Sequence, residues 1–392
     1  MANALLVVLG VLAVVTIAGL VALWPEGEDI ERPPGFGQLA TESATVTAVD
    51  AEGCLTVTSA EPGTGPGSPE CRRVTVRLDS GADRGESTAF DLRGQIDVGV
   101  GDKVRVADSM LPDDATVGGV PADRYNFSDF ERRSSLLWLT LAFAALVIIT
   151  SRWQGLRALI GLGFSLGIVV LFVVPGILEG HEPVAVATVG ALAIMLITIP
   201  LAHGLGPKSV AAALGTSVAL GITLGLAEFA TDVAHITGFG SEEASILSAT
   251  TDTSIQGLLL AGIVIGALGV LDDLTVTQAS TVMALRRADP HLGGRRLFSE
   301  GLSVGHDHIA ATVNTLVLAY AGASLPVLLI FSVGGTSFGD ALNSEFVAAE
   351  IVATLVGSIG LIAAVPITTA LAVVLATHVG QDRLGEAHSH AH

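Results

Sequence analysis

The chain begins with an apolar run, continues into a polar stretch of about a hundred residues, and then stays almost continuously apolar to near its end. A helix needs roughly 20 apolar residues to cross the hydrocarbon layer of a bilayer. The pattern therefore predicts an all-α polytopic membrane domain of about eight transmembrane helices. These spans are expected at residues 4–23, 136–150, 156–174, 183–201, 209–227, 255–271, 309–331 and 346–376.

Residues 24–134 have a different pattern, in which apolar and polar positions alternate over short runs. Such alternation at residues 44–49, 54–58, 74–78 and 104–106 is typical of half-buried strands. Short strands separated by turns in so small a segment favour a compact all-β barrel, and we expect an OB-like one. The segment holds 21 acidic and 11 basic residues, a net charge of −10. An acidic surface repels phosphates, so nucleic acid is not an expected partner.

Composition agrees with a membrane protein. Half of the 392 residues are hydrophobic and only 15% are charged, with a mean hydropathy of +0.66. The expected partner is therefore the lipid bilayer, and the external β domain could bind a cation, dock a protein or simply cap the structure. We expect an N-terminal transmembrane anchor at residues 1–23, a β domain at 24–134, a seven-helix membrane domain at 135–378 and a tail at 379–392. The first run lacks the basic flank and small-x-small site of a cleaved signal peptide, which favours an anchor.

The basic residues outside the β domain predict the orientation. All eight lie in alternate connections or in the tail, whereas the connections at residues 175–182, 228–254 and 332–345 contain none. The positive-inside rule then places both termini in the cytoplasm and the β domain outside. The eight residues are Arg152, Arg157, Lys208, Arg286, Arg287, Arg295, Arg296 and Arg383.

The two cysteines of the chain, Cys54 and Cys71, both fall in the predicted β domain. They flank an expected hairpin outside the membrane, where a disulfide could form and persist. The alternative is a pair of buried free thiols.

Polar groups concentrate where two predicted spans meet a basic connector. An acidic pair follows the span at 255–271, and a Gly-His-Asp-His sequence precedes the span at 309–331. Ionisable groups at the edge of an apolar span are costly and usually functional. Two adjacent carboxylates repel each other, which favours one of them holding a proton, and histidine titrates near neutral pH. The candidate proton-relay residues are Asp272, Asp273, Thr277, Asp307, His308, Asn314 and Thr315.

A structural alternative is that these groups only cap helices. Asp272 and Asp273 could close the first helix at its inner end, and the segment around His308 could cap the next. Other chemistries find little support in the sequence. No His-Glu-x-x-His motif or thiolate cluster predicts a metal site, and no Gly-rich phosphate loop predicts ATP hydrolysis. We therefore expect no cofactor, no metal and no enzymatic activity.

The stretches GVLDDLTVTQAS at residues 269–280 and DHIAATVNTLVLAYAGASLP at 307–326 resemble the YibE/F family of bacterial polytopic membrane proteins. Ala284 and His306 depart from the family pattern, where we would expect a carboxylate and an arginine. This resemblance implies a multi-pass protein of the bacterial cytoplasmic membrane, and it implies architecture more than activity.

The last three spans are also similar in pattern to the protein-export subunit SecF and to proton-driven resistance–nodulation–division transporters. An acidic pair, an amphipathic connector and a span bearing Thr and Asn carry that likeness. The first functional hypothesis is therefore a proton-coupled transporter or export-assisting protein. The second is a non-transporting scaffold or accessory subunit whose external domain docks a partner. The sequence identifies neither the substrate nor the oligomeric state.

Overall fold

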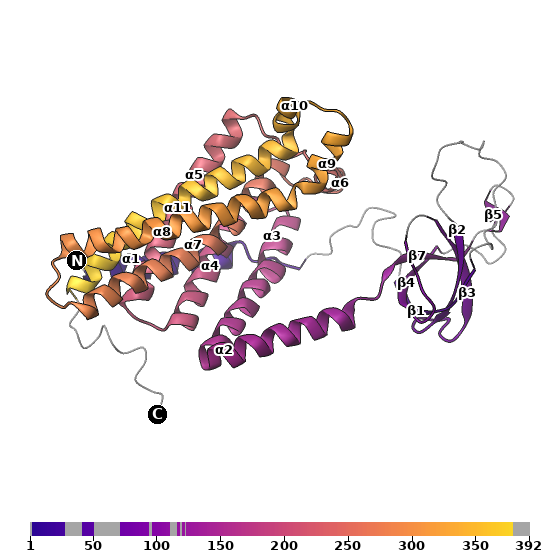
Figure 1. Ribbon diagram of the computed structural model, residues 1–392, viewed down its shortest axis with the longest axis horizontal. Coiled ribbons are helices and arrows are strands. Elements are labelled where there is room, and N and C mark those ends of the chain that lie inside the picture. Colours follow the sequence, from indigo (N-terminus) through magenta and orange to yellow (C-terminus); the bar gives the residue numbers. More distant parts are fainter. Residues whose placement is uncertain are drawn as a thin grey trace. The chain divides into compact units, whose positions relative to one another are not determined.

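A computed structural model describes residues 2–27, 41–50, 71–93, 96–109, 116–117, 120–121 and 123–378. It divides into two compact units, one made of residues 1–30 and 147–392 and the other of residues 31–146 (Figure 1). The first is helical and the second contains all the strands. Each unit is described below by itself.

The β unit is built on a five-stranded antiparallel sheet with the strand order β3-β2-β1-β4-β7. A separate pair of short strands, β5 and β6, accompanies it. The curved sheet is visible in Figure 1 as a half-barrel, whereas closure into an OB-like barrel stays a prediction. The strands are β1 (Thr41–Asp50), β2 (Cys71–Leu78), β3 (Ser87–Arg93), β4 (Lys103–Asp108), β5 (Thr116–Val117), β6 (Val120–Pro121) and β7 (Tyr125–Phe130).

Alternation along the strands forms the core of this unit. Val46 lies opposite Val76 in the β1–β2 ladder, and both side chains are buried. Because side chains alternate across a strand, the polar neighbours of these valines face the other side. The predicted strands at 44–49, 74–78 and 104–106 are confirmed within β1, β2 and β4. The predicted strand at 54–58 and the predicted Cys54–Cys71 disulfide depend on residues outside the described ranges.

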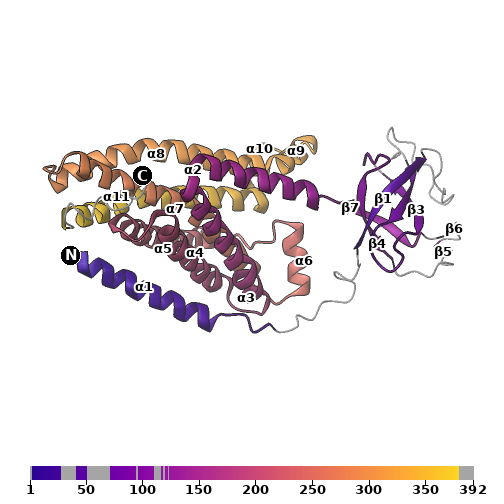
Figure 2. The same cartoon turned by 90° about the horizontal axis from the view of Figure 1, so that it is seen from below.

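The helical unit contains the long apolar helices, which are seen from two directions in Figures 1 and 2. Among the described residues, six helices are long and apolar enough to cross a membrane, or seven if the bent pair α8–α9 counts as one span. The helices are α1 (Ala2–Ala22), α2 (Arg133–Ile168), α3 (Val174–Leu178), α4 (Pro183–His203), α5 (Pro207–Val233), α6 (Glu242–Thr250), α7 (Ile255–Ala288), α8 (Gly294–Ala323), α9 (Leu325–Val333), α10 (Phe338–Asn343) and α11 (Glu345–His378). The first part of α2, up to residue 146, belongs to the other unit by this division.

The difference from the predicted eight spans lies at α2. This helix joins the expected spans at 136–150 and 156–174 into one candidate of 46 residues that also includes a π-helical turn, η1 (Val169–Val173), and α3. A break at Arg152, where φ is 49° and ψ is −127°, separates two helical arms. The helix count therefore gives six or seven candidates, and eight spans would require each arm to cross separately.

The core of the helical unit lies among α4, α5, α7 and α11. Close approaches occur where glycine faces threonine. A Cβ on Gly360 of α11 would lie 2.0 Å from Thr223 Oγ1 of α5, and one on Gly215 would lie 2.1 Å from Thr368 Oγ1. Only glycine allows the α5 and α11 backbones to come this close at those two points.

Charge is unevenly distributed between the two ends of the helical unit. At one end, Glu345 Oε1 accepts hydrogen bonds from Thr237 N at 2.8 Å and Gly238 N at 2.6 Å, and Glu179 accepts one from Gly27 N at 2.8 Å. These bonds join the loops next to α1, α3, α5 and α11. No Lys or Arg occurs in the described loops of this acidic end.

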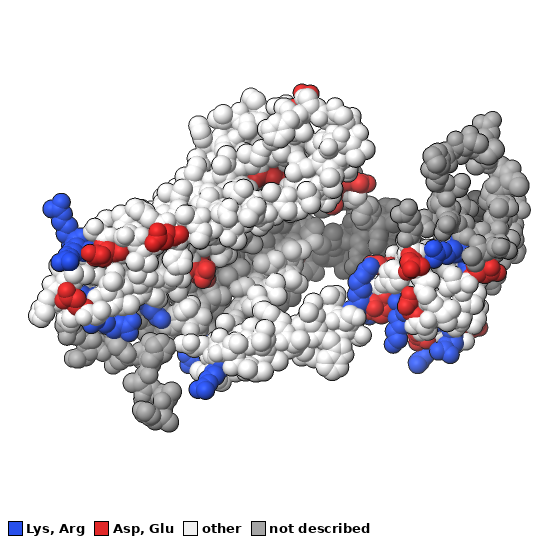
Figure 3. Space-filling view, in the orientation of Figure 1, with Lys and Arg blue, Asp and Glu red and all other residues white. Residues whose placement is uncertain are grey.

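The opposite end joins α4 to α5 and α7 to α8. Lys208, Arg286 and Arg296 all lie there, and Figure 3 shows the blue basic side chains gathered toward it. The connections with and without basic residues, which alternate along the sequence, thus lie at opposite ends of the helical unit. We refer to this as the basic end.

Candidate functional site

The acidic pair lies in the middle of α7, not at its end. Ser254 caps the start of this helix by accepting a hydrogen bond of 3.0 Å from Gly257 N, and the helix continues to Ala288. The expected span ended at residue 271, so the helix is 17 residues longer than predicted. At 1.5 Å per residue, Asp272 lies about 26 Å along the helix from Ile255, within the roughly 30 Å of a hydrocarbon layer.

This position removes the capping interpretation. Asp272 and Asp273 are many residues from the C-terminal cap at Asp289, and α8 begins at Gly294, more than three turns before His308. The backbone amides around these side chains are already engaged within helices. The role of these side chains must therefore be inferred from the groups that surround them in the bundle.

The two carboxylates of the pair have different surroundings. Asp272 is half-buried, and its Oδ2 accepts a hydrogen bond of 3.4 Å from Thr198 Oγ1 on α4. Its Oδ1 is buried without a hydrogen-bond partner in the described part of the chain. Asp273 is exposed and lies about 100° around the helix from Asp272. One carboxylate therefore contacts α4 within the bundle, while its neighbour is exposed at the edge of the α7–α8 contact.

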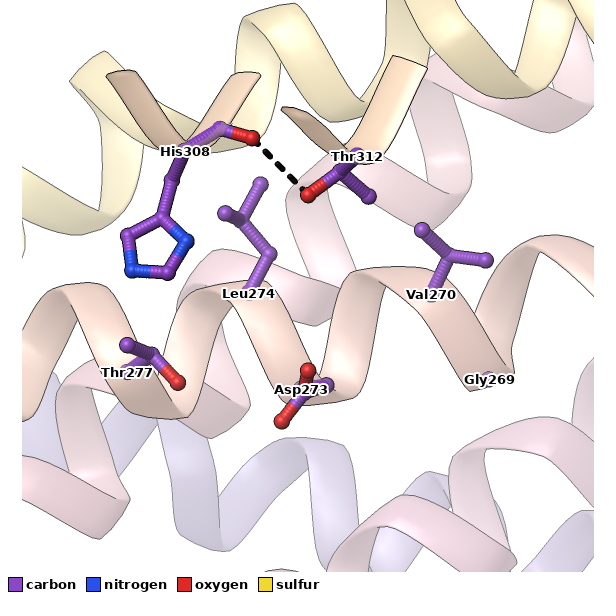
Figure 4. A pocket seen from close by; sticks show the side chains of 7 residues that line it. All are labelled: Gly269, Val270, Asp273, Leu274, Thr277, His308 and Thr312. Carbon is purple, nitrogen blue, oxygen red and sulfur yellow. Dashed lines mark hydrogen bonds between the residues drawn. The ribbon is translucent and has the colours of Figure 1, made fainter. Parts of the chain in front are cut away.

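Asp273 lines a hollow of about 230 Å³ between α7 and α8 (Figure 4). The imidazole of His308 projects from α8 toward α7, above the turn that carries Thr277. Thr312 lies one turn further along α8, and its hydroxyl donates a hydrogen bond of 2.9 Å to His308 O. The remaining walls are apolar or small: Gly269, Val270 and Leu274.

The hollow thus brings together one carboxylate, one imidazole and two hydroxyls. Among the described residues, neither Asp273 nor His308 forms an ion pair, so both retain free hydrogen-bonding capacity toward the hollow. Asp273 also interacts electrostatically with His203, at the end of α4. Carboxylate and imidazole groups can each bind and release a proton, and hydroxyls both donate and accept hydrogen bonds. The chemistry available here is proton exchange.

Three of the predicted relay residues lie elsewhere. Asp307, Asn314 and Thr315 are exposed on α8, and none of them lines the hollow. The Thr315 hydroxyl donates to Ala311 O of its own helix at 3.0 Å. Since successive helical residues are 100° apart, Asp307 points away from the direction taken by His308. Of the seven candidate relay residues, Asp273, Thr277 and His308 line the hollow. The sequence had assigned residues from two faces of α8 to one relay, and only one of those faces lines the hollow.

The buried polar contacts of α7 were not predicted. Thr275 Oγ1 and Thr216 Oγ1 on α5 share a hydrogen bond of 2.6 Å. Gln278 Nε2 donates to Gly301 O on α8 at 2.8 Å and to Thr369 Oγ1 on α11 at 2.7 Å. The sequence did contain a signal for these contacts, because an uncharged polar side chain on a membrane helix commonly forms a hydrogen bond with a neighbouring helix.

Comparison with known proteins places this arrangement in a family. A family model of YibE/F-like proteins matches residues 139–378, more than half of the chain. The chain belongs to the YibE/F family. The YibE/F match covers the candidate spans from α2 to α11, including every residue of the hollow. It leaves out α1 and the β unit. Searches of curated proteins and of solved structures gave no match.

Proposed function

We propose that this YibE/F-family membrane protein is a proton-coupled transporter or export-assisting protein. The observation that carries the proposal is the hollow between α7 and α8, which Asp273 and His308 both line. Two proton-binding groups at membrane depth are costly to maintain, and such groups commonly mark proton paths. The comparisons provide the family, and the substrate stays open.

In this proposal, Asp273 and His308 exchange protons across the hollow. An imidazole can receive a proton on one nitrogen and release another from the second, so His308 can relay without rotating. The hydroxyls of Thr277 and Thr312 can bridge the gap through water, since each is both a donor and an acceptor. Asp272 would be the proton-binding group inside the bundle, because its carboxylate accepts a hydrogen bond from Thr198 of α4.

The proposed orientation follows from the basic end of the helical unit. Lys and Arg are enriched on the cytoplasmic side of membrane proteins. We propose that the basic end faces the cytoplasm of a bacterium, with both termini on that side and the β unit outside the plasma membrane. In this orientation, α7 continues beyond the acidic pair for 15 residues toward the cytoplasm.

Infrared difference spectroscopy tests the proposal without knowledge of the substrate. The full-length protein in lipid vesicles is titrated between acid and neutral pH, and the carbonyl band of protonated carboxylic acids is followed. We expect a band that Asp273→Asn removes and that His308→Gln shifts along the pH axis. Asp252→Asn is the matched control, because Asp252 is an exposed loop carboxylate at the acidic end.

Proton flux gives the second readout. Vesicles loaded with a pH-sensitive dye receive a potassium diffusion potential, and the internal pH is recorded. An essential proton carrier contributes on the order of 100-fold or more, so Asp273→Asn should lower any wild-type flux by that order. A carbonyl band and a flux unchanged in Asp273→Asn and Asp272→Asn would overturn the proposal and leave the scaffold hypothesis.

A further inference from the structure

The helix α8 packs against the bundle on one side only. Its buried residues Leu297, Gly301 and Gly305 face α7 and α11, where Gln278 reaches Gly301. The opposite side of the helix is exposed along its whole length. We call this exposed row the outward seam. It consists of Val304, Asp307, Ala311, Asn314, Leu318 and Ala321.

The outward seam has the spacing of a helix–helix interface. Its members follow one another at intervals of three and four residues, so that Asp307, Asn314 and Ala321 repeat every seven. A seven-residue repeat keeps one stripe of a helix facing a second helix that runs beside it. Packing against the bundle does not explain this repeat, because the seam points away from the bundle.

Polar groups in the outward seam make lipid an unfavourable neighbour. The helix α8 is not apolar enough to count as a span alone and qualifies only together with α9, from which it is bent by 53°. Asn314 lies two residues beyond Thr312 in the direction away from the basic end, so it is about 3 Å deeper in the membrane than Thr312. No described residue forms a hydrogen bond with the Asn314 side chain. An amide left unpaired in hydrocarbon is costly.

We propose that the outward seam is the surface at which two copies of this chain pair in the membrane. Asn314 favours a second copy as the occupant, because a carboxamide is both donor and acceptor and is therefore complementary to itself. Two copies related by a two-fold axis along the membrane normal place Asn314 beside Asn314 at equal depth. The small side chains of Ala311 and Ala321 let the two helices approach.

Asp307 fits the same arrangement because it lies about 10 Å nearer the basic end than Asn314, at 1.5 Å per residue. Asp307 precedes His308 and therefore lies at the level of the hollow, toward the inner end of the span. A carboxylate reaches water and headgroups more easily there than at the bilayer centre. The interface stands apart from the proton path, since none of its residues lines the hollow. Pairing can therefore be tested without any transport assay.

Disulfide cross-linking in membranes tests this proposal. In full-length protein with Cys54→Ser and Cys71→Ser, single variants Asn314→Cys and Leu318→Cys are oxidised and separated on non-reducing gels. We expect a band of twice the chain mass for both. Ala319→Cys is the matched control, because Ala319 is exposed on the same helix but about 140° round from Asn314. It should give little of this band.

The contribution of the amide is measured in the Leu318→Cys background. Asn314→Leu should weaken pairing about three- to thirtyfold, the range that one interhelical hydrogen bond in a membrane provides, and Asn314→Gln should restore much of it. The proposal is overturned by absence of the band, by equal bands at Ala319 and Asn314, or by a product with a different protein. A cross-link within one chain, to a cysteine at Trp138 in the first arm of α2, would also overturn it.

Discussion

Gln278 on α7 and Thr369 on α11 are joined by a hydrogen bond of 2.7 Å from Gln278 Nε2 to Thr369 Oγ1. The same nitrogen donates to Gly301 O on α8 at 2.8 Å, and Gln278 is almost completely buried. One side chain therefore joins α7, α8 and α11. Because Gln278 follows Thr277 in the chain, this junction joins α7 to α8 beside the hollow.

Gln278→Leu should destabilise the protein by about 1 to 2 kcal/mol, because it leaves a buried carbonyl and a buried hydroxyl without their donor. Thermal unfolding in detergent measures the loss. Thr369→Ser keeps the acceptor and is the control, for which we expect a much smaller change. A Gln278→Leu protein as stable as wild type would show that the junction contributes nothing.

Gly305→Ala should also destabilise the protein, because a Cβ there would lie 2.4 Å from Val365 Cγ1 and 3.0 Å from Gln278 Oε1. Overpacking of this kind costs about 1 to 3 kcal/mol. Gly322→Ala is the matched control on the same helix, where a Cβ meets nothing within 4 Å. There the higher helix propensity of alanine should leave stability equal or slightly raised. Equal melting temperatures for the two variants would contradict the packing of α8 on α11.

Asp272→Asn should leave the protein as stable as wild type or more stable, because it removes a charge whose Oδ1 is buried without a partner. Asp273→Asn changes an exposed carboxylate and should shift stability by less than about 0.5 kcal/mol. Chemical denaturation of both variants measures these effects. Loss of folding in Asp272→Asn would show that the carboxylate has a structural role and would prevent its use as a test of proton transfer.

Acid should weaken the β unit through Asp129 and Glu131. The guanidinium of Arg132 lowers the pKa of Asp129, and a hydrogen bond from Arg133 N, with Arg105 adding a second, lowers the pKa of Glu131. A carboxyl whose pKa is lower in the folded state contributes stability above its unfolded pKa of about 4, and that stability is lost as the pH falls further. The protection of the β4 and β7 amides, taken as the exchange rate relative to the intrinsic rate at each pH, should therefore fall below about pH 4 in the full-length protein. The Glu131→Gln variant should show a smaller acid response, and an unchanged response would contradict this cause.

Cysteine labelling checks the proposed orientation. In the background with Cys54→Ser and Cys71→Ser, Glu243→Cys at the acidic end should react with an impermeant reagent added to intact cells. Gly293→Cys at the basic end should react only after permeabilisation, and a Cβ there meets nothing within 4 Å, so the substitution should be tolerated. The opposite pattern would reverse the orientation that the positive-inside rule predicts.

The sequence alone predicted those features that depend on whether a segment is surrounded by lipid, by water or by both. Apolar runs predicted α1, α4 and α5, because a helix of about 20 apolar residues matches the thickness of the hydrocarbon layer. Alternation predicted β1 and β4, because one face of a strand is buried there. Three of the candidate relay residues, Asp273, Thr277 and His308, line one hollow. The YibE/F resemblance was confirmed as well.

Tertiary structure decided what hydropathy cannot encode. The continuation of α7 to Ala288 crosses a polar segment, which stays helical through packing of buried residues such as Val282 against the neighbouring helices. Whether Asp272 or Asp273 faces the interior depends on the rotation of α7, and the contacts of Thr275 with α5 and Gln278 with α11 fix that rotation. Asp307 and Asn314 were assigned to the relay because their span was expected to face the acidic pair, but the side of α8 that packs contains the buried Gly301 and Gly305. A helix shows its periodicity in sequence, whereas the neighbour of each face depends on residues from other helices.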